Sequence, residues 1–177
     1  MTKFVYIAAS LDGYIADPRG GIEWLSDLPN PERSDYGWSE FLSGIDAILM
    51  GRKTFEKVLS FESWPYQLPV FVLSTSLQRI PARLIGKVDL IGGSPRELID
   101  LLNSKGFQNL YIDGGKTVQG FLAADLVDEL IITRIPILLG KGIPLFGELE
   151  DRLRFVHKGT DVYDNGLVQS RYQRSRK

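Results

Sequence analysis

Apolar runs of strand length alternate with amphipathic stretches along the first two thirds of the chain. Several of the apolar runs lack the polar positions that a strand with one solvated face would have, which indicates a sheet covered on both faces. The alternation of the two patterns predicts an α/β fold. The predicted strands are residues 4–10, 46–51, 69–74, 88–92, 109–114 and 129–136.

Helical periodicity lies between these strands, and a different pattern follows them. Ser94, Pro95 and Glu97 form a capping box with proline in the first turn of one helix. Beyond Gly147, two strand-like segments flank a turn at 164–166, so we expect an antiparallel hairpin at one edge of the sheet. No repeat or linker divides the chain, and we expect a single domain. The helices are expected at 35–43, 53–59, 95–105 and 117–124, and the hairpin strands at 153–160 and 167–174.

Composition and charge exclude several classes of function. With 21 basic and 22 acidic side chains there is no net field to attract a polyanion, so we expect no nucleic-acid partner, and we interpret the basic end "RYQRSRK" as a solvated terminus. Cysteine is absent and His157 is the only histidine, which excludes disulfide scaffolds, thiol nucleophiles and the usual zinc sites. Asp12 and Asp17 interrupt the N-terminal apolar run, so it predicts neither a signal peptide nor a membrane span. We expect a cytoplasmic protein with no metal and no membrane partner.

Glycine, hydroxyl and basic residues gather just beyond three of the strand ends. In an open α/β sheet, ligands bind at the carboxyl ends of the strands, where helix N-termini present unpaired N–H groups. Each segment alone also fits a capped helix or a plain turn, but three of them on one sheet suit a dinucleotide. Because no G-x-G-x-x-G motif follows the first strand, the residues alone predict only an α/β protein that binds a phosphorylated ligand. The segments are "MGRKTFE" at 50–56, "LSTS" at 73–76 and "DGGKT" at 113–117.

Four motifs in a fixed order carry a resemblance to a known family. They are "YIAASLDGYIAD", "AILMGRKTFE", "YIDGGKTVQGFL" and "DELIITRIPILLGKGIPLF", and they cover residues 4–146. The chain resembles the dihydrofolate reductase superfamily, in particular the reductase domain of the riboflavin-pathway bifunctional deaminase-reductase and its stand-alone relatives. The resemblance implies three layers around a mostly parallel sheet, NADPH as hydride donor, and a homodimer.

The resemblance also implies a cofactor site. The turn that begins at Gly51 matches the segment that contacts the cofactor phosphates, and the glycine pair at 114–115 matches the turn under the pyrophosphate. Arg52 is a charge partner for the 2'-phosphate of the adenosine. A small residue and an apolar residue near the N-terminus match the positions beside the nicotinamide. The implied cofactor residues are Ala9, Ile15, Gly51, Arg52, Lys53, Thr54, Ser74, Thr75, Gly114, Gly115, Lys116, Thr117 and Val118.

The substrate side rests on fewer matches. Asp35 matches the carboxylate that dihydrofolate reductases carry on their first helix, where an apolar pocket would raise its pKa and let it protonate a ring nitrogen. Asp35 equally fits the start of an ordinary helix, and Asp12 is a rival carboxylate. Trp24 and Trp38 either stack on a planar substrate or belong to the core. Thr133 matches a position beside the substrate carboxylate, and its alternative is a plain strand residue.

Two departures from the family pattern shape the predicted function. The loop at 20–34 is longer and more polar than the substrate loop of true dihydrofolate reductases and lacks their Pro-Trp pair, which puts folate recognition in doubt. The zinc-deaminase motif is absent, so the deaminase half of the bifunctional enzyme is not expected. The resemblance then implies a stand-alone NADPH-dependent reductase of a small heterocyclic substrate, such as 5-amino-6-(5-phosphoribosylamino)uracil. The alternatives are a true dihydrofolate reductase and a nucleotide-sensing protein without turnover.

Overall fold

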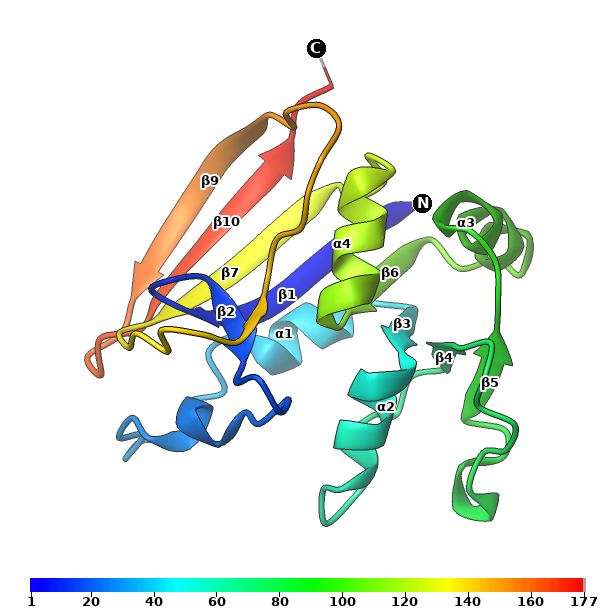
Figure 1. Cartoon of the computed structure of the whole chain (residues 1–177), viewed down its shortest axis with the longest axis horizontal. Coiled ribbons are helices and arrows are strands. Elements are labelled where there is room, and N and C mark those ends of the chain that lie inside the picture. The colour runs from blue at the N-terminus through cyan, green and yellow to red at the C-terminus, as the bar shows by residue number, and fades with distance from the viewer. Residues whose placement is uncertain (177) are drawn as a thin grey trace.

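A computed structural model, which describes residues 1–176, has one eight-stranded sheet at its centre (Figure 1). The six strands at one side of the sheet are mutually parallel, and the C-terminal hairpin continues the sheet in antiparallel fashion. The α/β fold and the hairpin are thus confirmed. From one edge to the other the strands are β5 (Val88–Ile91), β4 (Val70–Leu73), β3 (Ala47–Gly51), β6 (Asn109–Asp113), β1 (Thr2–Ser10), β7 (Glu129–Ile135), β10 (Val168–Arg174) and β9 (Phe155–Val162).

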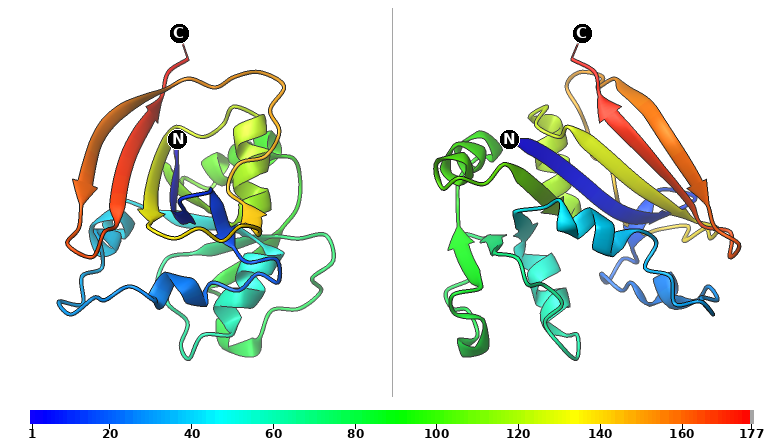
Figure 2. Two further views of the ribbon diagram at one scale, coloured as in Figure 1. Left: turned by 60° about the vertical axis from the view of Figure 1, so that its left-hand side comes forward. Right: turned by 180° about the vertical axis from the view of Figure 1, so that it is seen from behind.

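Helices cover both faces of the parallel part of the sheet (Figure 2). Helices α3 (Pro95–Ser104) and α4 (Gly115–Ala123) pack their apolar side chains into the core on one face. Helices α1 (Trp38–Ser43) and α2 (Arg52–Leu59) pack on the opposite face. The continuous apolar runs of the central strands follow from this double coverage. None of the helices in the described residues is long and apolar enough to cross a membrane.

Local signals place most element boundaries within a few residues of those predicted. The capping box forms as expected, because Ser94 and Glu97 each accept the backbone N–H of the other. Helix α1 starts later than predicted, because Tyr36 and Gly37 have left-handed φ angles of 54° and 85°. The periodicity missed a small second sheet of two short strands, β2 (Tyr14–Ala16) and β8 (Ile143–Pro144). Two 3-10 helices were also missed, Glu23–Ser26 and Ala82–Leu84.

Candidate functional site

The sheet splits between two of its central strands. Strands β1 and β6 pair only as far as Phe4 and Tyr111, whereas β1 continues to pair with β7 as far as Ser10. Beyond Phe4, the backbone edge of β1 that faces β6 therefore has no ladder partner. The Tyr111 hydroxyl donates to the Tyr6 carbonyl oxygen at 3.0 Å across this opening. The split leaves backbone donors and acceptors free to bind a flat polar group.

Two helices begin side by side at the mouth of this split. Strands β3 and β6 are neighbours, with Met50 opposite Asp113, so the helices that follow them, α2 and α4, start next to each other. Their N-caps are Gly51 and Gly114, and neither helix start receives a side-chain cap. The first N–H groups of both helices therefore remain available to an anion, with the positive ends of two helix dipoles beside them.

Internal packing explains three of the glycines at these helix starts. A Cβ atom at Gly51 would lie 2.7 Å from Thr117 Oγ1, and a Cβ atom at Gly114 would collide with Thr54 Oγ1. Gly114 also has a φ of 89°, which side chains rarely adopt. A Cβ atom at Gly115 would lie 2.9 Å from the side chain of Ile15. At each of these three positions a protein side chain already occupies the space that a Cβ atom would need.

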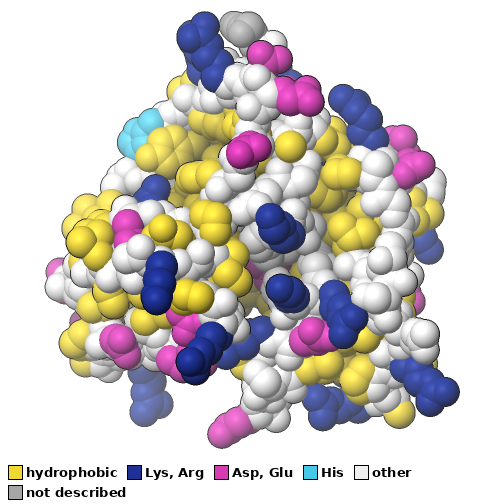
Figure 3. All heavy atoms as spheres, in the orientation of Figure 1, with side chains coloured by type: hydrophobic (Ala, Val, Ile, Leu, Met, Phe, Trp, Pro, Cys, Tyr) yellow, Lys and Arg dark blue, Asp and Glu magenta, His cyan; other side chains and the backbone are white. Residues whose placement is uncertain are grey.

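Basic side chains border the two helix starts. Lys53 and Lys116 are exposed in the first turns of α2 and α4. Arg52 Nη1 donates to Ser76 Oγ at 2.8 Å, and Arg52 Nε lies 2.6 Å from Glu56 Oε1. Arg52 thus bridges α2 and the loop after β4. Figure 3 shows Lys and Arg side chains gathered near the centre of this face of the molecule.

Some predicted cofactor residues are available only through their backbone. Ala9 and Val118 are fully buried, and Thr117 is nearly so. The Ser74 hydroxyl accepts the backbone N–H groups of Ser76 and Leu77, which shapes the loop after β4. Side chains that can reach a ligand here are therefore a subset of the predicted ones, and they include Lys53, Thr75 and Lys116.

Asp113 is a site residue that the sequence analysis did not single out. It is the last residue of β6 and precedes the glycine pair, and its Oδ1 accepts the N–H of Gly114 at 2.7 Å. Burial raises the pKa of the Asp113 carboxyl group to about 6 despite that bond. Burial also raises the pKa of Tyr111 and Tyr66, and the neighbouring charge of Asp113 adds to both shifts. The sequence signal that could have pointed to Asp113 was an acidic residue at the end of an otherwise apolar strand.

The two carboxylates proposed from the sequence have a different role in the structure. Asp35 is exposed and accepts the backbone N–H groups of Gly37 and Ser39, which together with the Ser39 hydroxyl lower its pKa. The expectation of an enclosed carboxyl group with a raised pKa is therefore wrong for Asp35. Asp12 accepts a hydrogen bond from Ser10 Oγ and the N–H of Gly140, and its pKa is also lowered. Both residues fix loops.

A buried network joins the loop before α1 to the C-terminal hairpin. Gln169 Nε2 donates to the Tyr6 hydroxyl, the Tyr36 carbonyl and Thr133 Oγ1 at 2.9, 3.2 and 3.0 Å. The Tyr6 hydroxyl donates to the same Tyr36 carbonyl at 2.7 Å. Thr133 is 6% exposed, so its hydroxyl is held inside this network. Sequence reasoning selected Thr133 but missed Gln169, because the partner lies far along the chain.

Both predicted tryptophans belong to the core. Trp38 packs edge-on against Tyr6 and Tyr111, with ring centroids 5.3 and 5.6 Å away. Trp24 is 8% exposed and packs against Ile135. Its Nε1 is buried with no hydrogen-bond partner in the part of the chain that the structure describes. Three protein rings, those of Tyr6, Phe41 and Tyr111, thus pack around the part-buried Trp38.

The fold and the edge of the sheet with its paired helix starts together define a protein of the dihydrofolate reductase-like α/β class. Dihydrofolate reductase from Enterococcus faecalis complexed with NADP(H) has this fold, with a TM-score of 0.68 at 17% identity, covering 98% of this chain and 96% of that one. The chain belongs to the RibD C-terminal domain family, which matches residues 4–169.

Two relatives of similar length and one longer protein support this assignment. A protein of Shewanella sp. PV-4, whose crystal structure carries the name of a riboflavin biosynthesis protein, is 50% identical in sequence to this chain. The two structures match with a TM-score of 0.95 over 99% of this chain and 100% of that one. The uncharacterized protein YwjB of Bacillus subtilis strain 168 is 37% identical over 97% of both chains. A Thermotoga maritima deaminase and 5-amino-6-(5-phosphoribosylamino)uracil reductase has a TM-score of 0.77 at 16% identity, covering 98% of this chain and 56% of that one. The chain therefore has the length of the first two relatives and the fold of the third.

Proposed function

We propose that the protein is an NADPH-dependent reductase that transfers a hydride to an imine-like or ribosyl carbon of a small heterocycle. The proposed substrate is of the 5-amino-6-(5-phosphoribosylamino)uracil type. One observation carries the proposal: the split between β1 and β6 opens beside two uncapped helix starts. A nicotinamide dinucleotide needs a slot for a flat ring next to a site for phosphate groups, and this edge offers both.

Different residues at the split between β1 and β6 would each bind a different part of the cofactor. The N–H groups after Gly51 and Gly114 would hold the pyrophosphate. Arg52 would pair with the 2'-phosphate, at a position fixed by its bond to Ser76. The free backbone edge of β1 near Ala9 would bind the carboxamide of the ring, and the ring supplies the hydride when it is bound.

Asp113 is the acid in this proposal. Its carboxyl group lies at the end of β6 where the split opens, and its pKa of about 6 leaves a protonated fraction of about one tenth at pH 7 and a larger one at lower pH. Donation of that proton to a substrate nitrogen would favour hydride arrival at the adjacent carbon. Tyr66 and Tyr111 are both buried and lie close enough to Asp113 for its charge to raise their pKa values, so the carboxyl group borders an apolar part of the core. Asp35, which is exposed, is not part of this step.

Consumption of NADPH in the presence of defined substrates tests the proposed reaction. We expect absorbance loss with the phosphoribosylaminouracil and none with dihydrofolate, because the loop at 20–34 does not match that of folate enzymes. Turnover of dihydrofolate would replace the proposed substrate with folate. Tight NADPH binding without turnover of any pyrimidine or pterin would favour a nucleotide-sensing protein. A homodimer is also proposed from the family resemblance, and a single-chain mass at high concentration would reject it.

A further inference from the structure

A pocket lies over the C-terminal strands of the sheet, and its Arg134 end adjoins the carboxyl end of β1. The hairpin of β9 and β10 extends beyond helix α4 (Figure 1). The pocket is bounded by β7, β10, β9 and the segment around Phe146, and its volume is about 250 Å³. In Figure 3 an apolar surface lies beside His157, the only histidine, on the outer strand of this hairpin. This volume is slightly below the range of about 300–1,000 Å³ for drug-sized ligands and suits a small molecule.

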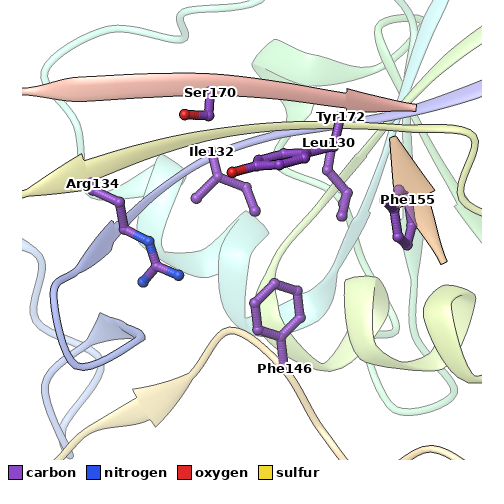
Figure 4. Close-up of a pocket in the computed structure, with 7 residues that line it drawn as sticks. All are labelled: Leu130, Ile132, Arg134, Phe146, Phe155, Ser170 and Tyr172. Carbon is purple, nitrogen blue, oxygen red and sulfur yellow. The ribbon is translucent and has the colours of Figure 1, made fainter. Parts of the chain in front are cut away.

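One end of this pocket carries an arginine without a carboxylate partner. Arg134 is part-buried on β7, and its guanidinium group points into the pocket (Figure 4). One of its donors, Nη1, bonds to the Ser10 carbonyl at 3.0 Å. Among residues 1–176, no Asp or Glu lies within ion-pair distance of Arg134. The remaining donors of the guanidinium fork are therefore available to a planar oxyanion.

The neighbouring arginine on the hairpin differs from Arg134 in this respect. Arg174 is not in the pocket lining, but its guanidinium carbon lies 5.8 Å from the centre of the ring of Phe155, which is. Its Nε is 2.7 Å from Asp125, so its charge is already compensated. The charge of Arg174 is thus compensated, whereas Arg134 leaves an uncompensated positive charge at its end of the pocket.

The rest of the pocket is apolar and aromatic. Leu130 and Ile132 form the floor on β7, and the rings of Phe146 and Phe155 lie toward the end opposite Arg134 (Figure 4). Phe146 is 44% exposed, which is a large exposure for an aromatic side chain. An apolar body placed between these rings would cover surface that is now in water.

Hydroxyl groups line the side between the two ends. Ser170 Oγ lies 2.8 Å from Thr160 Oγ1, which in turn lies 2.7 Å from His157 Nε2. The Tyr172 ring packs edge-on against His157, and its hydroxyl group points toward the Arg134 end in Figure 4. The pocket is therefore polar and cationic at one end and aromatic at the other.

We propose that this pocket binds a small monocarboxylate with an aromatic or branched apolar body. The carboxylate would pair with the Arg134 guanidinium, and the body would lie between Phe146 and Phe155. A charged pair in a partly enclosed site stabilises such a complex more than an exposed pair would. None of the pocket-lining residues belongs to the proposed cofactor site, but Arg134 pairs with Ala9 in the sheet, so the cofactor affinity of each variant is measured separately.

Calorimetric titration with 3-phenylpropionate tests the proposal, with 3-phenylpropionamide as the neutral match. We expect saturable binding of the carboxylate with a dissociation constant below about 1 mM, and binding of the amide at least about tenfold weaker. Arg134→Gln should weaken carboxylate binding by at least about tenfold. Arg96→Gln, on an exposed arginine of α3, removes the same charge and should leave the affinity unchanged.

Phe146→Ala supplies a second variant, because an exposed side chain can be truncated without unfolding the protein. This substitution should weaken the binding of both 3-phenylpropionate and 3-phenylpropionamide. Three results would overturn the proposal: no saturable binding, equal affinity for the acid and the amide, or a dimer that Phe146→Asp converts to a single chain. The last result would assign the pocket to a second copy of the protein. NADPH titrations of the same variants should be unchanged, which separates this site from the proposed function.

Discussion

At the scale of single residues, Asp113 has the environment that the sequence analysis expected of Asp35. Both are acidic, but one ends a central strand and the other lies in an exposed turn. Burial raises the pKa of the first, whereas hydrogen-bond donors lower the pKa of the second. Residue type alone therefore did not distinguish an acid from a helix-start residue, since the difference is in the surrounding structure.

The proton of Asp113 gives a prediction for activity. If its protonated form is the acid, kcat/KM should fall as pH rises through about 6, and Asp113→Asn should abolish that dependence and lower the rate about 100-fold or more. NADPH affinity should change little. A pH profile of the variant that matches the wild-type profile would remove Asp113 from the reaction.

The same group gives a prediction for stability. The folded protein keeps the Asp113 proton to a higher pH than the unfolded chain does. The free energy of unfolding should therefore decrease as the pH rises from the usual pKa of 3.8 to about 6. Asp113→Asn should therefore raise the free energy of unfolding by about 1–3 kcal/mol at neutral pH and by much less at pH 4. Denaturant unfolding at the two pH values measures this. Asp100→Asn, on an exposed carboxylate, is the matched control and should show no such difference.

Asp35 has the opposite prediction. Asp35→Ala removes the acceptor for two N–H groups at the start of α1 and should cost about 1 kcal/mol of stability. The rate of NADPH oxidation should stay within about twofold of wild type, since less than 1 kcal/mol of transition-state stabilisation would be lost. A severe loss of rate in a folded Asp35→Asn variant would restore the catalytic role that the family resemblance implies.

At the scale of elements, the turns after β3 and β6 depend on each other. The space above Gly114 is filled by Thr54, and the space above Gly51 by Thr117. Gly114→Ala should lower the free energy of unfolding by about 2 kcal/mol or more, because it combines a collision with a positive φ. Thr54→Ala in the same chain should recover part of that loss. Strictly additive effects in the double-mutant cycle would contradict the interlock.

Most elements could be predicted because their signals are local. Strand length, a capping box and an Asn-Gly turn are all present within a few consecutive residues. The pairing of β2 with β8 joins segments about 130 residues apart, each too short to show a period. The same limit applies to Gln169, whose partners come from three distant strands and loops. The cofactor edge was predicted from glycines and family motifs, and its proposed acid was not, because burial is a property of the folded chain.

At the scale of the whole molecule, the central claim is that the split sheet and the paired helix starts form one NADPH site. Three parallel strands, β1, β3 and β6, bring their carboxyl ends to this place, although their sequences are far apart. Arg52 then connects the helix start to the loop after β4, where the 2'-phosphate would lie.

Calorimetric titration with NADPH and NADH in parallel tests this claim most directly. We predict that NADPH binds at least about tenfold more tightly than NADH, and that Arg52→Ala removes most of this difference while Arg96→Ala does not. Absence of binding by both cofactors would contradict the proposed site. Equal affinities that Arg52→Ala leaves unchanged would contradict the placement of the 2'-phosphate.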